Sequence, residues 1–358
     1  MRIVIAAGGT GGHIYPALAI ADALRAAFQT ETLFIGTPRG LESRLVPPAG
    51  YRLSLVRIGQ FNQVSLRTRL RTLFDLPASV LHCSRILRDF RPHVVIGVGG
   101  YASGPAMAAA IFSRLPTLAV EPNAFPGLAN RVIGKRVSAA AINFAAAEKY
   151  FREPQVTGIP VRAEFFHLRP RPEGAPPHLL VFGGSQGARA LNTLMPQIAA
   201  SLLDAVPGLT ILHQAGARHA DDTLAAYFAS GAPSTRWQVL DFLDDMPHRF
   251  EAADLVLSRS GASTAAELAA AGKPSLLIPF PRSADDHQRR NAEAFVAAGA
   301  SRMLLEPGLT PALLLETLAA LLTDRETLKL MSSAARRLAH ADASRRIAAM
   351  VAELARPT

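Results

Sequence analysis

The sequence predicts an α/β protein made of two Rossmann-like, doubly wound domains that face a deep cleft. Its 358 residues exceed one ordinary hydrophobic core and suit two domains of about 150–200 residues each. Twice along the chain, an apolar run leads into a glycine-rich turn and then into a helical stretch. The first unit covers residues 2–7, 8–12 and 16–28, and the second covers residues 178–182, 183–187 and 188–195. A strand, a glycine turn and a helix open a doubly wound domain.

Further apolar runs of strand length lie between alanine-rich helical stretches. They cover residues 33–35, 94–98, 118–120, 209–213, 255–257 and 275–278. Strands that alternate with helices favour a parallel sheet with helices on both faces.

A proline-rich stretch, residues 154–177, lies between the two halves and is interpreted as the hinge and the region just after it. We therefore expect a first domain over residues 1–158 and a second domain over residues 159–340. The helical tail, from about residue 341 to 358, is expected to cross back to the first domain. Ligands of doubly wound domains bind at the carboxyl ends of the strands, so the cleft between the domains is the expected site.

Composition and cysteine content favour a folded protein of a reducing compartment. Half of the residues are apolar and 18% are charged, and the single cysteine, Cys83, excludes an internal disulfide. The apolar run at residues 3–7 is shorter than the core of a signal peptide. The most apolar longer stretch, residues 94–112, is interrupted by glycines and by Pro105, so we expect no membrane span.

The whole net charge of +10 lies in the first half of the chain. Residues 1–160 hold 18 basic and 8 acidic residues, whereas residues 161–358 hold 20 of each. Nucleic acid, an anionic membrane or an anionic substrate would each account for this excess, as would a solvated basic surface.

Four glycine turns follow apolar strands, at residues 8–12, 97–104, 183–187 and 258–263. Glycine lets the backbone approach a ligand closely, and the helix that follows directs free N–H groups and its positive end to the same place. Each turn alone is explained by the needs of a doubly wound fold. The four together predict binding of diphosphate groups.

The sequence motifs of common nucleotide-binding and metal-binding sites are absent. Ile14 stands where a dinucleotide fingerprint needs its third glycine, and no acid ends the second strand at residues 34–37. The sequence contains no P-loop, no Asp-x-Asp and no zinc-like spacing of His and Cys. We therefore expect no metal and no cofactor, with the diphosphate stabilised by backbone amides, helix dipoles and arginine.

Four motifs resemble the MurG family of peptidoglycan GlcNAc transferases. They are Gly8-Gly-Thr-Gly-Gly-His-Ile-Tyr-Pro16, Gly99-Gly-Tyr-Ala-Ser-Gly-Pro105, Gly183-Gly-Ser-Gln-Gly-Ala188 and Arg259-Ser-Gly-Ala-Ser-Thr-Ala-Ala-Glu267. The family's order and spacing are followed from residue 2 to about residue 350. The resemblance implies a GT-B fold and metal-free, inverting transfer of GlcNAc from UDP-GlcNAc to undecaprenyl-diphosphate-MurNAc-pentapeptide, which converts lipid I to lipid II.

The resemblance also implies roles for individual residues. Matching acceptor-side positions are Gly99, Gly100, Tyr101 and Ser103. Matching donor-binding positions are Thr10, Gly11, Gly12, Asn123, Arg162, Ser185, Leu243, Ala262, Ser263, Thr264, Ala265, Ala266, Glu267 and Gln288. Among them, the Leu243 backbone would read uracil, Glu267 the ribose, and Asn123 and Gln288 the sugar hydroxyls.

His13 is the candidate catalytic residue. It lies at the start of a helix, where the dipole favours the neutral imidazole, and a neutral imidazole can accept the proton of the attacking acceptor hydroxyl. Direct binding of the acceptor diphosphate is an alternative role, and so is a structural hydrogen bond in the turn.

Other candidates also have alternative interpretations. Thr264 and Glu267 have the spacing of a capping box, so Glu267 could serve the start of a helix. Gly272 is interpreted as the end of that helix. Arg162 could form an ion pair between the domains instead of contacting the donor, and Cys83 is interpreted as simply buried.

Two places depart from the family pattern. The family has His-Glu-Gln-Asn where this chain has Val120-Glu-Pro-Asn123, so two polar side chains are absent beside the expected cleft. A pair of glutamines stands in the family where this chain has His287-Gln288, and histidine can still form a hydrogen bond there.

An arginine-rich segment, residues 66–90, is the candidate membrane contact. Its apolar residues recur at helical spacing and include Leu70, Leu73 and Phe74, with Arg67 and Arg71 beside them. Such a stripe can lie in an anionic interface, although a crossover helix packed on its own sheet is the alternative, and Pro77 predicts that the segment is not one long helix. With a lipid-linked acceptor, we expect a peripheral protein on the cytoplasmic face of the inner membrane.

The expected partners are UDP-GlcNAc, the lipid-linked acceptor, an anionic membrane surface and other cell-wall synthesis proteins, but not nucleic acid. Rival hypotheses are another GT-B enzyme that uses a UDP-sugar, such as a lipid glycosyltransferase or a nucleotide-sugar epimerase, and a non-catalytic nucleotide-sugar-binding scaffold. The glycine loop at residues 99–105 favours an acceptor that carries its own diphosphate.

Overall fold

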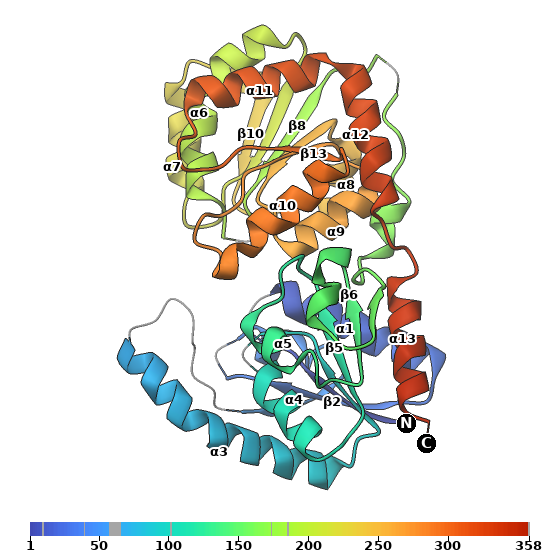
Figure 1. Cartoon of the computed structure of the whole chain (residues 1–358). Helices are drawn as coiled ribbons and strands as arrows, with labels where there is room; N and C mark the ends of the chain where they lie inside the picture. Colours follow the sequence, from blue (N-terminus) through green and yellow to red (C-terminus); the bar gives the residue numbers. More distant parts are fainter. Residues whose placement is uncertain are drawn as a thin grey trace. The chain divides into compact units, whose positions relative to one another are not determined.

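A computed structural model describes residues 1–8, 11–38, 40–56, 66–100, 102–172, 174–184 and 186–356, with side chains for all of these except Gly11 and residues 66–74. The chain forms two units: Met1–Val161 with His340–Thr358 is unit 1, and Arg162–Ala339 is unit 2. Each unit contains one parallel sheet with helices on both sides (Figure 1), which confirms the predicted pair of doubly wound α/β domains.

Unit 1 has seven parallel strands in the order β3-β2-β1-β4-β5-β6-β7. Their bounds are β1 Arg2–Ala6, β2 Glu31–Gly36, β3 Arg52–Leu55, β4 Val94–Gly97, β5 Thr117–Glu121, β6 Ala139–Ile142 and β7 Pro154–Val156. The strand order reverses between β1 and β4, so the loops after these two strands diverge at a topological switch point.

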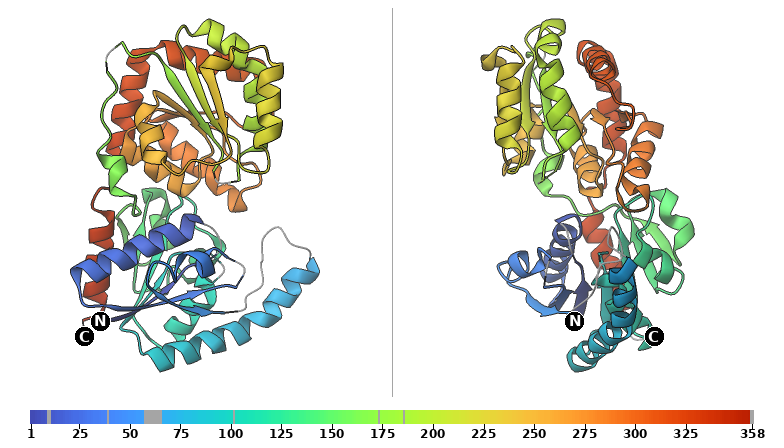
Figure 2. Two further views of the ribbon diagram at one scale, coloured as in Figure 1. Left: turned by 180° about the vertical axis from the view of Figure 1, so that it is seen from behind. Right: turned by 90° about the vertical axis from the view of Figure 1, so that its left-hand side faces the viewer.

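The helices of unit 1 bury the apolar faces of this sheet. They are α1 Gly11–Ala27, α2 Glu42–Leu45, α3 Leu66–Phe90, α4 Ser103–Phe112, α5 Leu128–Ile133, the 3₁₀ helix η1 Ala145–Tyr150 and α13 Ala343–Leu354. Val4 and Ala6 of β1 pack with Cys83 of α3 and Met107 of α4. Helix α1 covers the opposite face and contacts α13 (Figure 2), and Cys83 is fully buried, as the sequence predicts.

Helix α3 differs from its prediction. It continues through Pro77 as a single helix of 25 residues, whereas the proline predicts an interruption. A proline inside a helix removes one backbone hydrogen bond, and packing along the rest of the helix can offset that loss. Among the residues described, no helix is both long and apolar enough to cross a bilayer.

Unit 2 has six parallel strands in the order β10-β9-β8-β11-β12-β13. Their bounds are β8 His178–Phe182, β9 Thr210–Gln214, β10 Trp237–Leu240, β11 Leu255–Ser258, β12 Ser275–Leu277 and β13 Ser301–Met303. Its helices are α6 Arg189–Ala205, α7 Ala220–Ala229, α8 Met246–Ala252, α9 Ala262–Ala271, α10 His287–Ala297, α11 Pro311–Thr323 and α12 Arg325–Arg337. Three 3₁₀ helices complete it: η2 Ala163–Phe166, η3 Ser234–Arg236 and η4 Ala284–Asp286.

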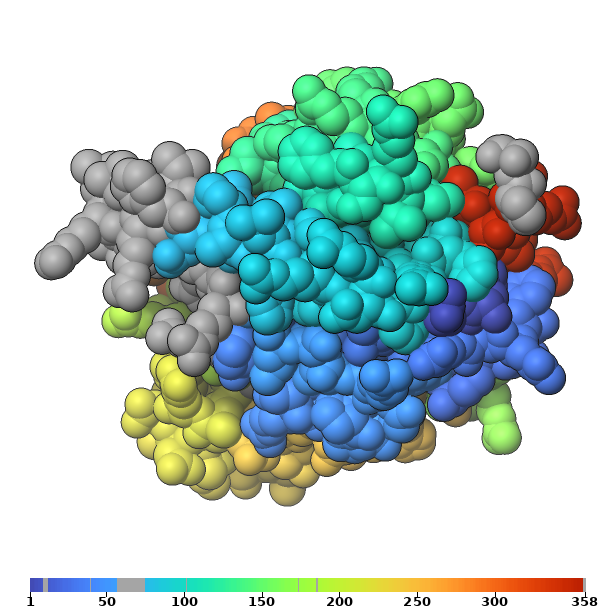
Figure 3. Space-filling view, turned by 90° about the horizontal axis from the view of Figure 1, so that it is seen from below, coloured from blue at the N-terminus to red at the C-terminus, as the bar shows by residue number. Residues whose placement is uncertain are grey.

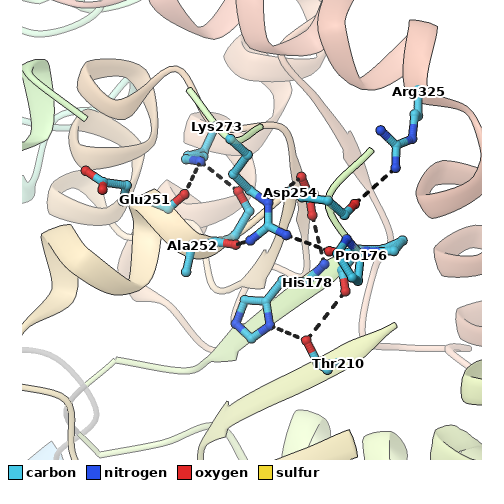
Figure 4. A network of polar contacts seen from close by, with 12 residues as sticks. Pro176, His178, Thr210, Glu251, Ala252, Asp254, Lys273 and Arg325 are labelled. Carbon is cyan, nitrogen blue, oxygen red and sulfur yellow. Dashed lines mark hydrogen bonds and ion pairs between the residues drawn. The ribbon is translucent and has the colours of Figure 1, made fainter. Parts of the chain in front are cut away.

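The proline-rich stretch divides between the two units. Its first residues form β7, while its later residues are bonded to unit 2. Arg171 forms an ion pair with Asp254 at 3.1 Å, and the carbonyl of Ala175 accepts a hydrogen bond from Arg325 at 3.1 Å. Figure 4 shows Asp254 among Lys273, Pro176 and His178 in the same network. Most of the stretch interpreted as a hinge is therefore fixed to one unit or the other.

Candidate active site

At the switch point of unit 1, the loops after β1 and β4 are in contact. A Cβ on Gly100 would lie 2.0 Å from the carbonyl oxygen of Gly8, and a Cβ on Gly99 would lie 2.9 Å from the His13 ring. Both glycines also have positive φ, 92° for Gly99 and 79° for Gly100. These positions therefore require glycine, because only a loop without side chains can pass between the first glycine turn and His13.

His13 lies in the first turn of α1, as predicted, and its ring is half-buried. Its Nδ1 is 2.9 Å from the carbonyl oxygen of Val98. A carbonyl can only accept, so Nδ1 carries a proton, and the neutral ring then has its lone pair on Nε2. This tautomer suits a general base, and a protonated ring would suit an anion. Both roles of His13 remain compatible with the geometry.

A buried carboxylate shapes the loop that carries Asn123. Glu121 ends β5 with 2% of its surface exposed, and its two oxygens accept four hydrogen bonds. Oε1 accepts from the backbone and side-chain N–H groups of Asn123, and Oε2 accepts from Gly127 N–H and the Asn130 amide. Burial raises the pKa of Glu121, opposed by these hydrogen bonds. Because its Nδ2 donates to Glu121, Asn123 has its amide oxygen turned away from that carboxylate.

The two residues that depart from the family pattern here, Val120 and Pro122, occupy buried positions at the base of this loop. Val120 is fully buried in β5, and Pro122 is buried beside it. The Pro122 carbonyl accepts a hydrogen bond from Asn143 at 3.2 Å. The two apolar residues therefore form the packed base of the Asn123 loop.

Among the acceptor-side candidates that the structure describes, Gly99 and Gly100 have no side chain and Ser103 has a buried one. Ser103 begins α4 with its side chain fully buried, 2.6 Å from where a Cβ on Gly97 would lie. Its hydroxyl has no hydrogen-bond partner among the described residues. Thr10, Tyr101 and Ser185 lie outside the described residues.

In unit 2, the donor-side glycine turn is packed against the end of β9. A Cβ on Gly187 would lie 1.8 Å from the carbonyl oxygen of Ala215, which accepts a hydrogen bond from Asn192 at 2.8 Å. His213 supports this amide, since its Nε2 donates to Asn192 Oδ1 at 3.1 Å. Burial lowers the pKa of His213 to about 3, so the ring is neutral, and its Nδ1 accepts from Tyr227 at 3.2 Å.

The backbone segment at residues 241–243, which is expected to read uracil, is held by a side chain at the end of β9. Gln214 donates from its side chain to the carbonyl of Asp241 at 3.0 Å. Leu243 is 6% exposed, whereas Phe242 is 51% exposed. The backbone of residues 241–243 is therefore held by β9, with Phe242 at the surface.

Helix α9 begins at the last glycine turn of unit 2. Its N-cap is Gly261, which has an ordinary φ of −61°, and a Cβ there would meet no protein atom within 4 Å. The capping-box interpretation is wrong, because Thr264 lies inside the helix instead of at its cap. Gly272 ends the helix with a φ of 59°, as predicted. The helix start, which includes Ala262, Ser263, Ala265 and Ala266, thus has open space beside its cap.

Glu267 and Arg162 are brought together within unit 2. The Arg162 guanidinium lies 3.9 Å from the Glu267 carboxylate. Desolvation raises the pKa of Glu267 to about 7, and the charge of Arg162 opposes that shift. The ion pair predicted as an alternative for Arg162 thus exists, but its partner lies in the same unit.

Gln288 lies in the first turn of α10, beside an unusual turn. Asp285 and Asp286 before it have positive φ values of 52° and 56°, a conformation that is strained for residues other than glycine. The backbone N–H of Phe280 donates to the Gln288 amide oxygen at 3.0 Å, and Nδ1 of His287 donates to the Ala284 carbonyl at 2.6 Å. His287 therefore serves the local turn, and the amide nitrogen of Gln288 is turned away from Phe280.

Sequence reasoning missed several residues that hold these loops. Glu121, Arg259 and Gln214 each lie at or directly after the end of a buried strand, where a charged or amide side chain was a signal that could have been followed. Glu306, whose carboxylate lies 2.6 Å from the Arg259 guanidinium, has no such signal, because it follows the short, partly exposed strand β13.

Comparison with known proteins identifies the family. Residues 3–142 match the glycosyltransferase family 28 N-terminal domain, and residues 178–347 match the glycosyltransferase family 28 C-terminal domain. A UDP-N-acetylglucosamine–N-acetylmuramyl-(pentapeptide) pyrophosphoryl-undecaprenol N-acetylglucosamine transferase of Solibacter usitatus is 42% identical over 356 residues, which cover 99% of this chain and 96% of that protein. The chain belongs to this transferase family.

Solved structures agree with this assignment to the MurG family. The crystal structure of Acinetobacter baumannii MurG has a TM-score of 0.84 at 29% identity and covers 98% of this chain and 99% of its own. This match confirms the GT-B fold. The UDP-GlcNAc 2-epimerase of Neisseria meningitidis has a TM-score of 0.67 at 13% identity, over 99% of this chain and 100% of its own, and shares the fold alone.

Proposed function

We propose that the protein transfers GlcNAc from UDP-GlcNAc to the MurNAc of undecaprenyl-diphosphate-MurNAc-pentapeptide, with inversion at the anomeric carbon. The observation that carries this proposal is the 42% identity, through 99% of the chain, to a transferase named for that reaction. The glycine turns after β1 and β4 in unit 1, and after β8 and β11 where the strand order of unit 2 reverses, support it, because donor and acceptor each contain a diphosphate.

In the reaction, the acceptor hydroxyl oxygen bonds to the anomeric carbon of GlcNAc as the bond from that carbon to the β-phosphate oxygen breaks. UDP leaves with the electron pair, and the hydroxyl proton must pass to a base. His13 can take it on Nε2, because Val98 holds the other ring proton on Nδ1. If His13 instead binds the acceptor diphosphate, it does so as a protonated donor.

The donor-side residues of unit 2 would bind UDP without a metal. The start of α9 offers free N–H groups and a positive helix end to the diphosphate, and the open space beside Gly261 lets phosphate oxygens approach. Ionised Glu267 can accept hydrogen bonds from both ribose hydroxyls. The backbone at Leu243 would read uracil, and Gln288 would read a sugar hydroxyl.

A lipid-linked acceptor requires the enzyme to reach the membrane, and we place that contact on unit 1, at the cytoplasmic leaflet. Helices α3 and α4 contact each other and lie side by side on one face of unit 1, cyan and teal in Figure 3. Phe112 at the end of α4 is 79% exposed, and Leu81 of α3 is 63% exposed. Arg85 and Arg88 are exposed on the same helix as Leu81. Apolar and basic side chains together suit an anionic lipid surface.

Measuring the release of UDP with and without acceptor separates this proposal from its rivals. The purified protein is incubated with UDP-GlcNAc alone and then with lipid-linked MurNAc-pentapeptide in detergent. We expect UDP release only with the acceptor. Conversion of UDP-GlcNAc without acceptor would favour an epimerase or hydrolase, and binding of UDP-GlcNAc without release under either condition would favour a scaffold.

A further inference from the structure

A buried arginine connects the loops after three neighbouring strands of unit 2. Arg259 follows β11 and is 8% exposed. Its Nη1 donates to the carbonyls of Ile278 at 3.0 Å and Pro279 at 3.2 Å, just after β12. Its Nη2 lies 2.6 Å from the carboxylate of Glu306, in the loop after β13. One guanidinium therefore fixes the carboxyl end of this half of the sheet.

The loop held by Arg259 also orients Gln288. Phe280 directly follows Pro279, its ring lies under the Arg259 guanidinium at 5.5 Å, and its N–H donates to the Gln288 amide oxygen at 3.0 Å. An amide whose oxygen accepts from a backbone N–H must direct its NH₂ group elsewhere. The orientation of Gln288 therefore depends on where Arg259 holds residues 278–280.

The backbone of Gln288 has a separate anchor. Its carbonyl accepts from the Ser260 hydroxyl at 2.8 Å, and the Asn291 amide donates to the carbonyl of Ser260 at 3.1 Å. These bonds hold the start of α10 without involving Glu306. Loss of the ion pair should therefore disturb the Gln288 side chain more than the helix that carries it.

We propose that Glu306, acting through Arg259, is a positioning residue that fixes the Gln288 amide with its NH₂ group directed to the donor sugar. A buried guanidinium without its anion is poorly stabilised and shifts toward water. The carbonyls of residues 278–279 then move with it, and the Gln288 amide can rotate by half a turn, presenting oxygen where it presented nitrogen. The inference rests on the proposed reading of the sugar by Gln288.

Binding measurements test the proposal without requiring turnover. The affinities of UDP, UDP-GlcNAc and UDP-GalNAc are measured by titration calorimetry for the wild type, Glu306→Gln and Glu316→Gln. Glu306→Gln keeps the side-chain shape but removes its charge, and Glu316 is an exposed residue of α11 that serves as the matched control. We expect Glu306→Gln to lower the affinity for UDP-GlcNAc about tenfold and to reduce the preference for UDP-GlcNAc over UDP-GalNAc. The affinity for UDP itself should change by less than about twofold.

A double variant tests whether the effect passes through Gln288. Adding Glu306→Gln to Gln288→Ala should cost little further affinity for UDP-GlcNAc, because the group being positioned is already absent. Additive losses, or an equal loss of affinity for UDP and both sugar nucleotides, would overturn the proposal and leave Glu306 as a general support of the fold. In a further outcome, the wild type binds as expected and Glu306→Gln shows the expected loss, while the wild type transfers no GlcNAc. That result would support the positioning role of Glu306 and refute the proposed function.

Discussion

The guanidinium of Arg162 and the carboxylate of Glu267 lie 3.9 Å apart, in a setting where desolvation raises the pKa of Glu267 to about 7. The positive charge of Arg162 opposes this shift but does not cancel it. A carboxylate that is to accept hydrogen bonds from ribose hydroxyls thus changes its ionisation state near neutral pH.

Donor affinity should therefore rise with pH. A carboxyl with a raised pKa is mostly protonated below that pKa and ionised above it, and the ionised form is the stronger acceptor. We expect UDP to bind up to about tenfold more tightly at pH 8 than at pH 6. The same calorimetric titration on Glu267→Gln should show no such rise, and a rise as steep as that of the wild type would contradict the assignment.

Removing the Glu267 side chain should affect the donor more than the fold. Glu267→Ala is expected to raise the KM for UDP-GlcNAc, while the free energy of unfolding changes by less than about 1 kcal/mol, since the residue does not cap α9. Steady-state kinetics and urea unfolding on the same preparation decide this. If Glu267→Ala has a normal KM for UDP-GlcNAc but a clearly lower free energy of unfolding, the role of Glu267 is purely structural.

Glu121 should be needed for both stability and activity. Glu121→Ala removes the carboxylate that accepts four hydrogen bonds from Asn123, Gly127 and Asn130 in a buried loop. We expect the free energy of unfolding to fall by about 3 kcal/mol, together with a loss of transfer activity. Glu148→Ala, at an exposed position of η1, is the matched control. Unchanged stability of Glu121→Ala in urea unfolding would show that the loop does not depend on this carboxylate.

The central strands could be predicted from the sequence because they are continuous apolar runs buried on both faces. Each predicted run coincides with a strand, among them β1, β4, β8 and β11 at the two switch points. Strands at or next to the sheet edges were missed for physical reasons. The sequence of β6, Ala139–Ile142, is rich in alanine, which favours helix, and β7 is a three-residue edge strand that begins with Pro154.

The glycine turns of the candidate site could also be predicted, because the positive φ of Gly99 and Gly100 is a local backbone requirement that favours glycine. The residues that support the site could not. Glu306 lies 47 residues after Arg259 in sequence and meets it only because β11, β12 and β13 are neighbours in the sheet. Such a pair depends on tertiary contacts that local patterns do not encode.

Transfer activity should not require a divalent metal. The sequence has no Asp-x-Asp, and the α9 start and glycine turns can stabilise the diphosphate with N–H groups and helix dipoles. We expect activity in EDTA to stay close to that of an untreated sample. Complete loss in EDTA, with recovery on adding Mg²⁺ or Mn²⁺, would refute this view of the donor site.

Membrane docking should depend on apolar and basic residues of unit 1. The protein is expected to sediment with anionic vesicles at low salt and less at high salt, because each basic residue near the surface contributes about 1 kcal/mol. Phe112→Ser with Leu81→Ser should weaken sedimentation while UDP binding is unchanged, and Leu73→Ser with Phe74→Ser tests the N-terminal part of α3. If a folded, active preparation does not sediment with anionic vesicles at low salt, the proposed membrane contact is refuted.

The transfer reaction itself is the most direct test of the proposed function. Purified protein is incubated with UDP-GlcNAc labelled in the sugar and with undecaprenyl-diphosphate-MurNAc-pentapeptide, and the butanol-soluble product is isolated and its new glycosidic linkage analysed. We expect acceptor-dependent label in the butanol phase, in a β-linked GlcNAc on MurNAc. Absence of labelled lipid with a folded protein that binds UDP-GlcNAc, or an α-linked product, would contradict the proposed function.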